Sequence, residues 1–187
     1  MTMLLAGVLL WSFMHLLPGV AATLRRGIIE KLGLGPYKLV YSLILLASIG
    51  LMVAGWRASQ PEQLFIASWL PLHAAYALIY LGVFLMAVSS FNSRIKRVIR
   101  HPQLTGFAIF SIAHVLVNGD SRSTLLFGGL AAWAVVEMLV INRRDGEWHK
   151  PQPPAIAQEL KPLLASIAVF FALFFAHPYL SGHALAF

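Results

Sequence analysis

Six apolar segments of roughly 20 residues constrain what this chain can fold into. A helix of about 20 apolar residues crosses the ~30 Å hydrocarbon core of a bilayer. We therefore predict about six membrane-spanning helices, over residues 3–22, 37–55, 69–90, 102–117, 123–141 and 163–184. The expected fold class is an all-α, polytopic membrane bundle that forms a single domain over residues 1–187.

The composition agrees with a membrane protein. The chain is 59% hydrophobic and 11% charged, whereas a soluble domain carries about 25% charged residues. The sequence contains no cysteine, which excludes disulfides, thiolate ligands and cysteine nucleophiles. It also lacks a phosphate-binding loop, a zinc-protease motif and a nucleophile elbow.

The basic residues give the topology. The net charge is +7, but the charge falls in three loops on one side of the predicted bundle and is not spread as a nucleic-acid surface. These loops contain Arg25, Arg26, Lys31 and Lys38; Arg94, Lys96, Arg97 and Arg100; and Arg143, Arg144, Lys150 and Lys161. Basic loops stay inside, so both termini are expected outside, and the loops are expected to contact anionic lipid. We expect no nucleic-acid partner.

Histidines at membrane depth are the candidate functional residues. At 1.5 Å per helical residue, His15 lies about 10 Å and His114 about 16 Å from the inner face. Intramembrane histidines bind metals, carry protons or hydrogen-bond a neighbouring helix. A haem iron takes two axial imidazoles within an apolar bundle. His15 with His114 is a workable pair by depth, and His114 with His177 and His73 with His177 are the alternatives.

Arg100 and His101 precede the fourth segment, at its inner end. An inner carboxylate or phosphate could meet the cation and the helix N-terminus there. A haem propionate or a nucleotide-like cofactor would fit, and the structural alternative is helix capping with lipid headgroup contact. Glu137 is interpreted as reaching the basic pair Arg143 and Arg144, with a site role as the alternative.

A longer pattern contains these residues. Arg100-His101-Pro102-Gln103-Leu104-Thr105-Gly106 is followed by Ala113-His114 and by Asn118-Gly119-Asp120. The combination resembles the NnrU family of bacterial membrane proteins. The resemblance implies an inner-membrane protein associated with nitrite and nitric oxide reduction. The family is also similar to plant 15-cis-zeta-carotene isomerase, a membrane enzyme that holds haem b through histidines.

That similarity implies haem b in this chain, with His114 and His15 as the iron ligands. We hypothesise that Arg100 and His101 hold the haem propionates. If the protein is an enzyme, the implied reaction is redox-gated cis–trans isomerisation of a hydrophobic polyene. A non-catalytic accessory protein of denitrification is the other class.

A rival family shares the Arg-His-Pro element. Membrane methyltransferases of the isoprenylcysteine carboxyl type use it to hold S-adenosylmethionine at the inner face. Those proteins also carry a paired glutamate signature, whereas this chain has only the isolated Glu137, Glu147 and Glu159 in its second half. This departure weakens the methyltransferase interpretation. A pocket open to the inner side at Arg100 would favour it, and a groove lined by Phe107, Phe110 and Phe174 would favour the isomerase.

Overall fold

A computed structural model describes residues 1–182. The α-helices are α1 (Thr2–Val20), α2 (Ala22–Leu32), α3 (Leu34–Ala58), α4 (Leu72–Val88), α5 (Pro102–Asn118), α6 (Ser121–Ser123), α7 (Gly129–Asp145) and α8 (Leu160–Ser181). Short helical turns are η1 (Arg94–Arg97), η2 (Thr124–Gly128) and η3 (Ile156–Glu159). No strand occurs within this range, where Gln63 and Asp120 form an isolated bridge. The predicted all-α class is confirmed.

Each of the six predicted segments contains a helix. Four helical stretches, Thr2–Val20, Leu34–Ala58, Ser121–Asp145 and Ile156–Ser181, are long and apolar enough to cross a membrane. Helices α4 and α5 are apolar but have 17 residues each, which gives about 26 Å against a ~30 Å core. The chain is therefore a membrane protein by these helices, and the count of six crossings stays a prediction. The expected end of the last segment, at residue 184, lies outside the described residues.

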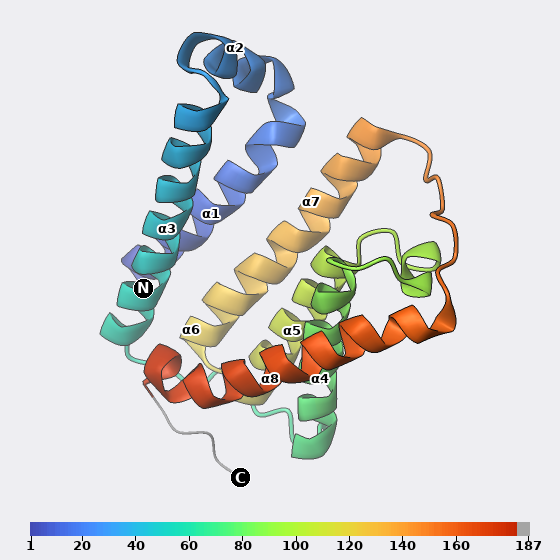
Figure 1. The fold of residues 1–187 in the computed structure, drawn as a ribbon. Helices are drawn as coiled ribbons and strands as arrows, with labels where there is room; N and C mark the ends of the chain where they lie inside the picture. Colours follow the sequence, from blue (N-terminus) through green and yellow to red (C-terminus); the bar gives the residue numbers. More distant parts are fainter. Residues whose placement is uncertain (183–187) are drawn as a thin grey trace.

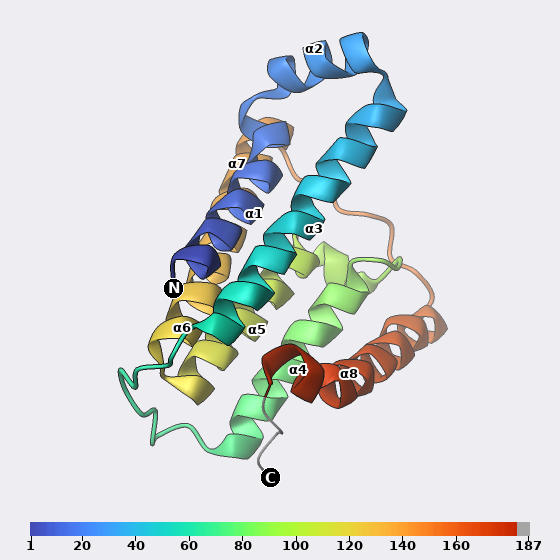
Figure 2. The same ribbon diagram turned by 90° about the vertical axis from the view of Figure 1, so that its left-hand side faces the viewer.

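The helices form two pairs joined by a central helix. Helix α1 packs along α3, and α4 packs along α5, while α7 contacts both α1 and α5 (Figures 1 and 2). Glycines permit the close approach of α4 and α5. A Cβ atom at Gly82 would lie 2.7 Å from the carbonyl oxygen of Gly106, so neither position has room for a side chain.

Helix α8 packs differently from the others. It crosses α4 at a steep angle (Figure 1), and the Tyr80 hydroxyl lies 3.2 Å from Ser166 Oγ at the crossing. The end of α8 reaches α3, where Trp56 Nε1 donates to the carbonyl oxygen of Ser181 at 3.1 Å. The amino group of Met1 donates to Ser59 Oγ at 2.7 Å. The N-terminus and the end of α8 therefore lie at the same end of α3, as the predicted topology requires.

The buried core lies where α1, α3, α5 and α7 meet, and it is built from small and medium-sized apolar side chains around two tryptophans. Its members are Leu4, Val8, Met52, Trp56, Ala108, Leu130, Trp133 and Ala134. Gly129 faces Val8 across this core, where a Cβ atom would lie 2.8 Å from Val8 Cγ1. This contact fixes the depth of α1 relative to α7, and with it the position of His15.

Candidate functional site

His114 is half-buried near the outer end of α5. Its ring lies between Phe110, with ring centroids 4.2 Å apart, and Phe127, at 4.4 Å. Its Nδ1 lies 2.8 Å from the carbonyl oxygen of Phe110. A carbonyl oxygen can only accept, so Nδ1 donates its proton, and in the neutral imidazole Nε2 then carries the lone pair.

Phe127 reaches His114 from an irregular segment. It belongs to η2, a π-helical turn between α6 and α7. Such turns widen a helix by one residue and often occur at functional sites. The turn interrupts the predicted fifth segment beside the histidine, a feature that apolar periodicity does not reveal.

His15 has the same local arrangement on α1. Its Nδ1 lies 2.9 Å from the carbonyl oxygen of Trp11, four residues earlier, so by the same argument Nε2 holds the lone pair. Its ring contacts Trp11 at 4.2 Å and Trp133 at 4.9 Å, and Tyr41 lies 6.4 Å away. Both predicted ligands, as neutral imidazoles, therefore present Nε2 as the unprotonated nitrogen.

The structure does not join the two histidines directly. His15 contacts Trp133, whereas His114 contacts Phe127. Phe127 lies six residues before Trp133 in the continuous helical stretch Ser121–Asp145. Six residues correspond to about 9 Å of depth. Among residues 1–182 no ring contact or hydrogen bond links His15 with His114, and no group of three or more His, Asp or Glu residues is arranged to hold a metal ion.

His177 interacts electrostatically with His114. It lies on α8, and its Nδ1 lies 3.2 Å from Ser181 Oγ. This corresponds to the alternative pair of His114 and His177. His73, by contrast, is exposed at the start of α4.

A polar group around His15 was not predicted from the sequence. Four buried polar atoms, from α1, α3 and α7, have no hydrogen-bond partner among the described residues: Trp11 Nε1, Tyr37 Oη, Trp133 Nε1 and Glu137 Oε2. Glu137 lies beside Trp133 and within electrostatic range of Tyr41 and Arg144. Buried polar atoms without partners are rare and call for a bound water, ion or ligand. The isolated glutamate was the sequence signal. Trp133 lies one turn earlier on the same helix, whereas Trp11, Tyr37 and Tyr41 come from α1 and α3.

Arg100 and His101 lie at the opposite end of α5 from His114. His101 Nε2 lies 2.9 Å from Asn142 Oδ1 of α7, so His101 ties the two helices together. Both residues line a cavity of about 370 Å³ that is also bordered by Lys96, Gln103 and Trp148. Arg100 is 14 residues from His114 along the helix, or about 21 Å. The predicted propionate role therefore requires a haem at the level of His15.

The last part of the sequence pattern, Asn118-Gly119-Asp120, has a structural role. Gly119 adopts φ +61°, a left-handed conformation that suits glycine. Its carbonyl oxygen accepts from the amides of Leu64 and Phe65 at 2.8 and 3.1 Å. The Asp120 side chain accepts from the amide of Ser123 at 2.8 Å and caps α6. These bonds fix the outer loop to α5.

Comparisons with known proteins identify one family. A family described as NnrU protein matches residues 3–185, nearly the whole chain. No curated protein and no solved structure matches the chain. The family match covers the apolar helices, both predicted ligand histidines and the Arg100 pattern. The chain therefore belongs to the NnrU family.

Proposed function

We propose that this protein is a multi-pass haem b protein of the bacterial inner membrane, with His114 as an iron ligand. The observation that carries the proposal is the tethered imidazole: Nδ1 bonds the carbonyl oxygen of Phe110 and leaves Nε2 to coordinate. Metal-ligating histidines almost always donate their second nitrogen to a carbonyl or carboxylate in this way. The surrounding rings of Phe110 and Phe127 supply the apolar, aromatic surface that a macrocycle requires.

The second ligand is proposed to be His15, which has the same tethered geometry. Coordination of one iron by both histidines requires the rings between them to rearrange around the haem. His177 is the competing ligand, because it already lies within electrostatic range of His114. Arg100 and His101 are proposed to hold the propionates of a haem that lies at the depth of His15. A haem centred on His114 would be too far away, because Arg100 lies about 21 Å from His114 along the helix.

A bound haem would supply reversible one-electron chemistry in the membrane. We propose that this supports nitrite or nitric oxide metabolism, and we keep redox-gated isomerisation of a polyene as the enzymatic variant. The aromatic packing favours the first role. Phe107 and Phe110 pack against Trp133 and Phe127, with ring centroids 5.7 and 6.3 Å apart respectively, and so contribute to a closed interior.

The cavity at Arg100 favours the alternative, a methyltransferase that binds S-adenosylmethionine. Its volume of about 370 Å³ falls at the lower end of the range for small-molecule sites. Glu159 does not supply the glutamate that the methyltransferases of the isoprenylcysteine carboxyl type require. It accepts from Ser93 Oγ and from the amide of Arg94, both at 2.7 Å, and so anchors a loop.

Absorption spectra test the proposal. Detergent-purified protein is measured oxidised and reduced, as wild type and as His114→Ala, His15→Ala and His177→Ala, with the exposed His73→Ala as the matched control. We expect a reduced six-coordinate b-haem spectrum that His114→Ala abolishes or changes and that His73→Ala retains.

The second iron ligand is identified by which further variant, besides His114→Ala, has a changed haem spectrum. A change in His15→Ala supports the predicted pair, whereas a change in His177→Ala replaces it. A wild type that stays colourless after haem is added contradicts the proposal, and S-adenosylmethionine binding is then the next measurement.

A further inference from the structure

Hydrogen bonds from basic side chains hold the walls of the cavity at the inner end of α5, and one basic side chain there makes no such bond. The wall segment 146–159 is tied to η1, because Arg97 Nη1 donates to the carbonyl oxygen of Pro151 at 2.9 Å and Arg94 Nε donates to that of Pro154 at 2.9 Å. Lys96, which lines the cavity, donates to the carbonyl oxygen of Ser89 at 2.7 Å. Three of the four basic residues between 94 and 100 thus hold the backbone in place.

Arg100 is the fourth, and its guanidinium is not used in this way. It lines the cavity and has no hydrogen-bond acceptor in the described part of the chain. A guanidinium carries five N–H donors in a planar fork. The acidic side chain in electrostatic range is Asp145, which is already paired with Arg144 at 2.7 Å. The donors of Arg100 are therefore available to a ligand.

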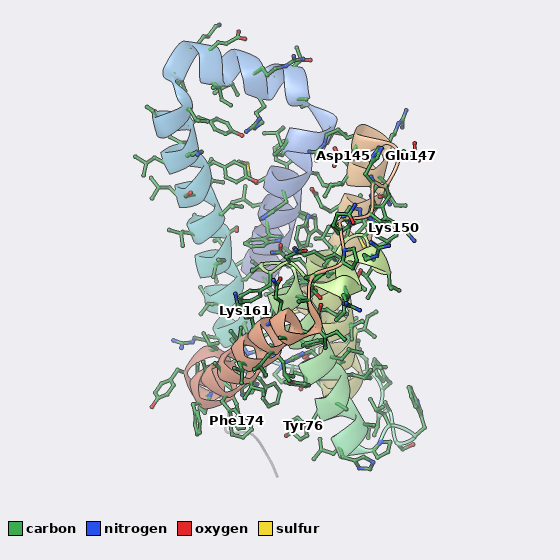
Figure 3. The ribbon with its side chains drawn as sticks, turned by 45° about the vertical axis from the view of Figure 1, so that its right-hand side comes forward. Tyr76, Asp145, Glu147, Lys150, Lys161 and Phe174 are labelled. Carbon is green, nitrogen blue, oxygen red and sulfur yellow. The ribbon has the colours of Figure 1, made fainter. Side chains whose placement is uncertain are left out.

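The surroundings indicate what kind of ligand this is. A second ammonium group, that of Lys150, lies 5.2 Å from the ring centroid of Trp148, which also lines the cavity. Figure 3 shows Lys150 at this end of the molecule together with two carboxylates, Glu147 and the Asp145 that is paired with Arg144, and Tyr76 and Phe174 lie toward the other end. Arginine and lysine beside an interfacial tryptophan match a phosphate group, which a guanidinium binds through two parallel hydrogen bonds.

Exposed apolar residues close in sequence to the cavity-lining residues favour a lipid as the source of that phosphate. Val98 is 80% exposed and Ile156 is 72% exposed, and they follow η1 and begin η3 on either side of the basic residues. Such side chains are stable in the acyl region just below the headgroups. We propose that this cavity binds the phosphodiester headgroup of an anionic phospholipid from the inner leaflet, with Arg100 as the principal contact. The proposal does not depend on haem binding, and it assigns the Arg100 guanidinium to the lipid phosphate in place of a haem propionate.

Native mass spectrometry of the full chain tests it. The protein is released from micelles that contain equal amounts of phosphatidylglycerol and phosphatidylcholine. We expect wild type to retain phosphatidylglycerol preferentially, and Arg100→Gln to weaken this retention at least about fivefold, the effect of one basic residue near an anionic surface. Arg100→Lys, which keeps the charge but not the fork, should retain an intermediate amount. Arg57→Gln, an exposed arginine at the end of α3 away from the basic loops, is the matched control and should behave as wild type.

Two further arms separate the sources of the anion. Excess inorganic phosphate should leave the lipid bound, and complete displacement would assign the site to free phosphate. Loss of the lipid on addition of haem would assign Arg100 to a propionate and overturn the lipid proposal. Equal retention of both lipids by wild type, or unchanged retention by folded Arg100→Gln, would overturn it as well. Circular dichroism establishes that each variant is folded.

Discussion

At the scale of single residues, Glu137 is the acidic side chain of the polar group around His15, and Trp133 and Arg144 are the groups that stabilise its charge. Its Oε2 is buried without a hydrogen-bond partner in the described structure, and so are the indole nitrogens of Trp11 and Trp133. A charge in such a position costs free energy unless it is paired or hydrogen-bonded. This cost is tolerated where a site needs it, and His15 lies against both indoles.

Removal of the Glu137 charge is expected to stabilise the fold. Glu137→Gln keeps the size of the side chain and removes a charge that Trp133 and Arg144 compensate only in part, which we expect to be worth about 1 kcal/mol. For a chain of this length, that corresponds to a rise in Tm of roughly 2–4 °C, measured by thermal unfolding in detergent. Glu147→Gln in the exposed inner loop is the control and should leave Tm unchanged. A lower Tm in Glu137→Gln would mean that the carboxylate holds a bound water or cation.

At the scale of elements, α5 carries the sequence pattern because it performs several tasks at once. Its N-terminal end binds α7 through His101 and Asn142, and its C-terminal end holds the outer loop through Gly119. Gly106 allows the backbone to touch α4. The side chains of His114 and Arg100 make no hydrogen bond to another helix in the described chain, which leaves both available to a ligand.

The close contact of α4 and α5 predicts that Gly106→Ala destabilises the protein. The added methyl group would meet the carbonyl oxygen of Gly82 and the Cβ of Leu85, and overpacking of this kind costs about 1–3 kcal/mol. Tm should fall by several degrees in detergent. Gly50→Ala provides the control, because nothing lies within 4 Å of a Cβ atom there. Equal melting of the two variants would show that the helices separate in solution.

At the scale of the whole molecule, the bundle is two helix pairs held together by α7, with α8 laid across one of them (Figure 2). The described end of α8 and the start of α1 both lie beside the end of α3. The basic loops lie away from this end. This arrangement agrees with the charge asymmetry and leaves one question, whether the short helices α4 and α5 cross the bilayer.

Cysteine labelling answers that question. The sequence contains no native cysteine, so each introduced cysteine is the only thiol that can react. Single substitutions Ser68→Cys, Asn92→Cys and Glu147→Cys are exposed to a membrane-impermeant maleimide in intact spheroplasts. With six crossings, Ser68→Cys is labelled at once, while Asn92→Cys and Glu147→Cys react only after permeabilisation. Labelling of Asn92→Cys in intact spheroplasts would show that α4 and α5 enter and leave on one side, and the count of crossings would then be four.

The sequence by itself determined the class of protein and the helices, and it predicted an orientation and the two candidate histidines. Hydrophobic length and the side of the basic loops are sums over neighbouring residues, and the Nδ1 bonds of His15 and His114 reach back four residues within one helix. Only the tertiary structure decided what those residues meet. The separation of His15 from His114, the proximity of His177, the polar group at Glu137 and the cavity at Arg100 depend on which helices become neighbours. The hydrophobic effect is non-directional and does not distinguish the apolar residues of one helix from those of another. The apolar pattern alone therefore does not determine which helices pack together.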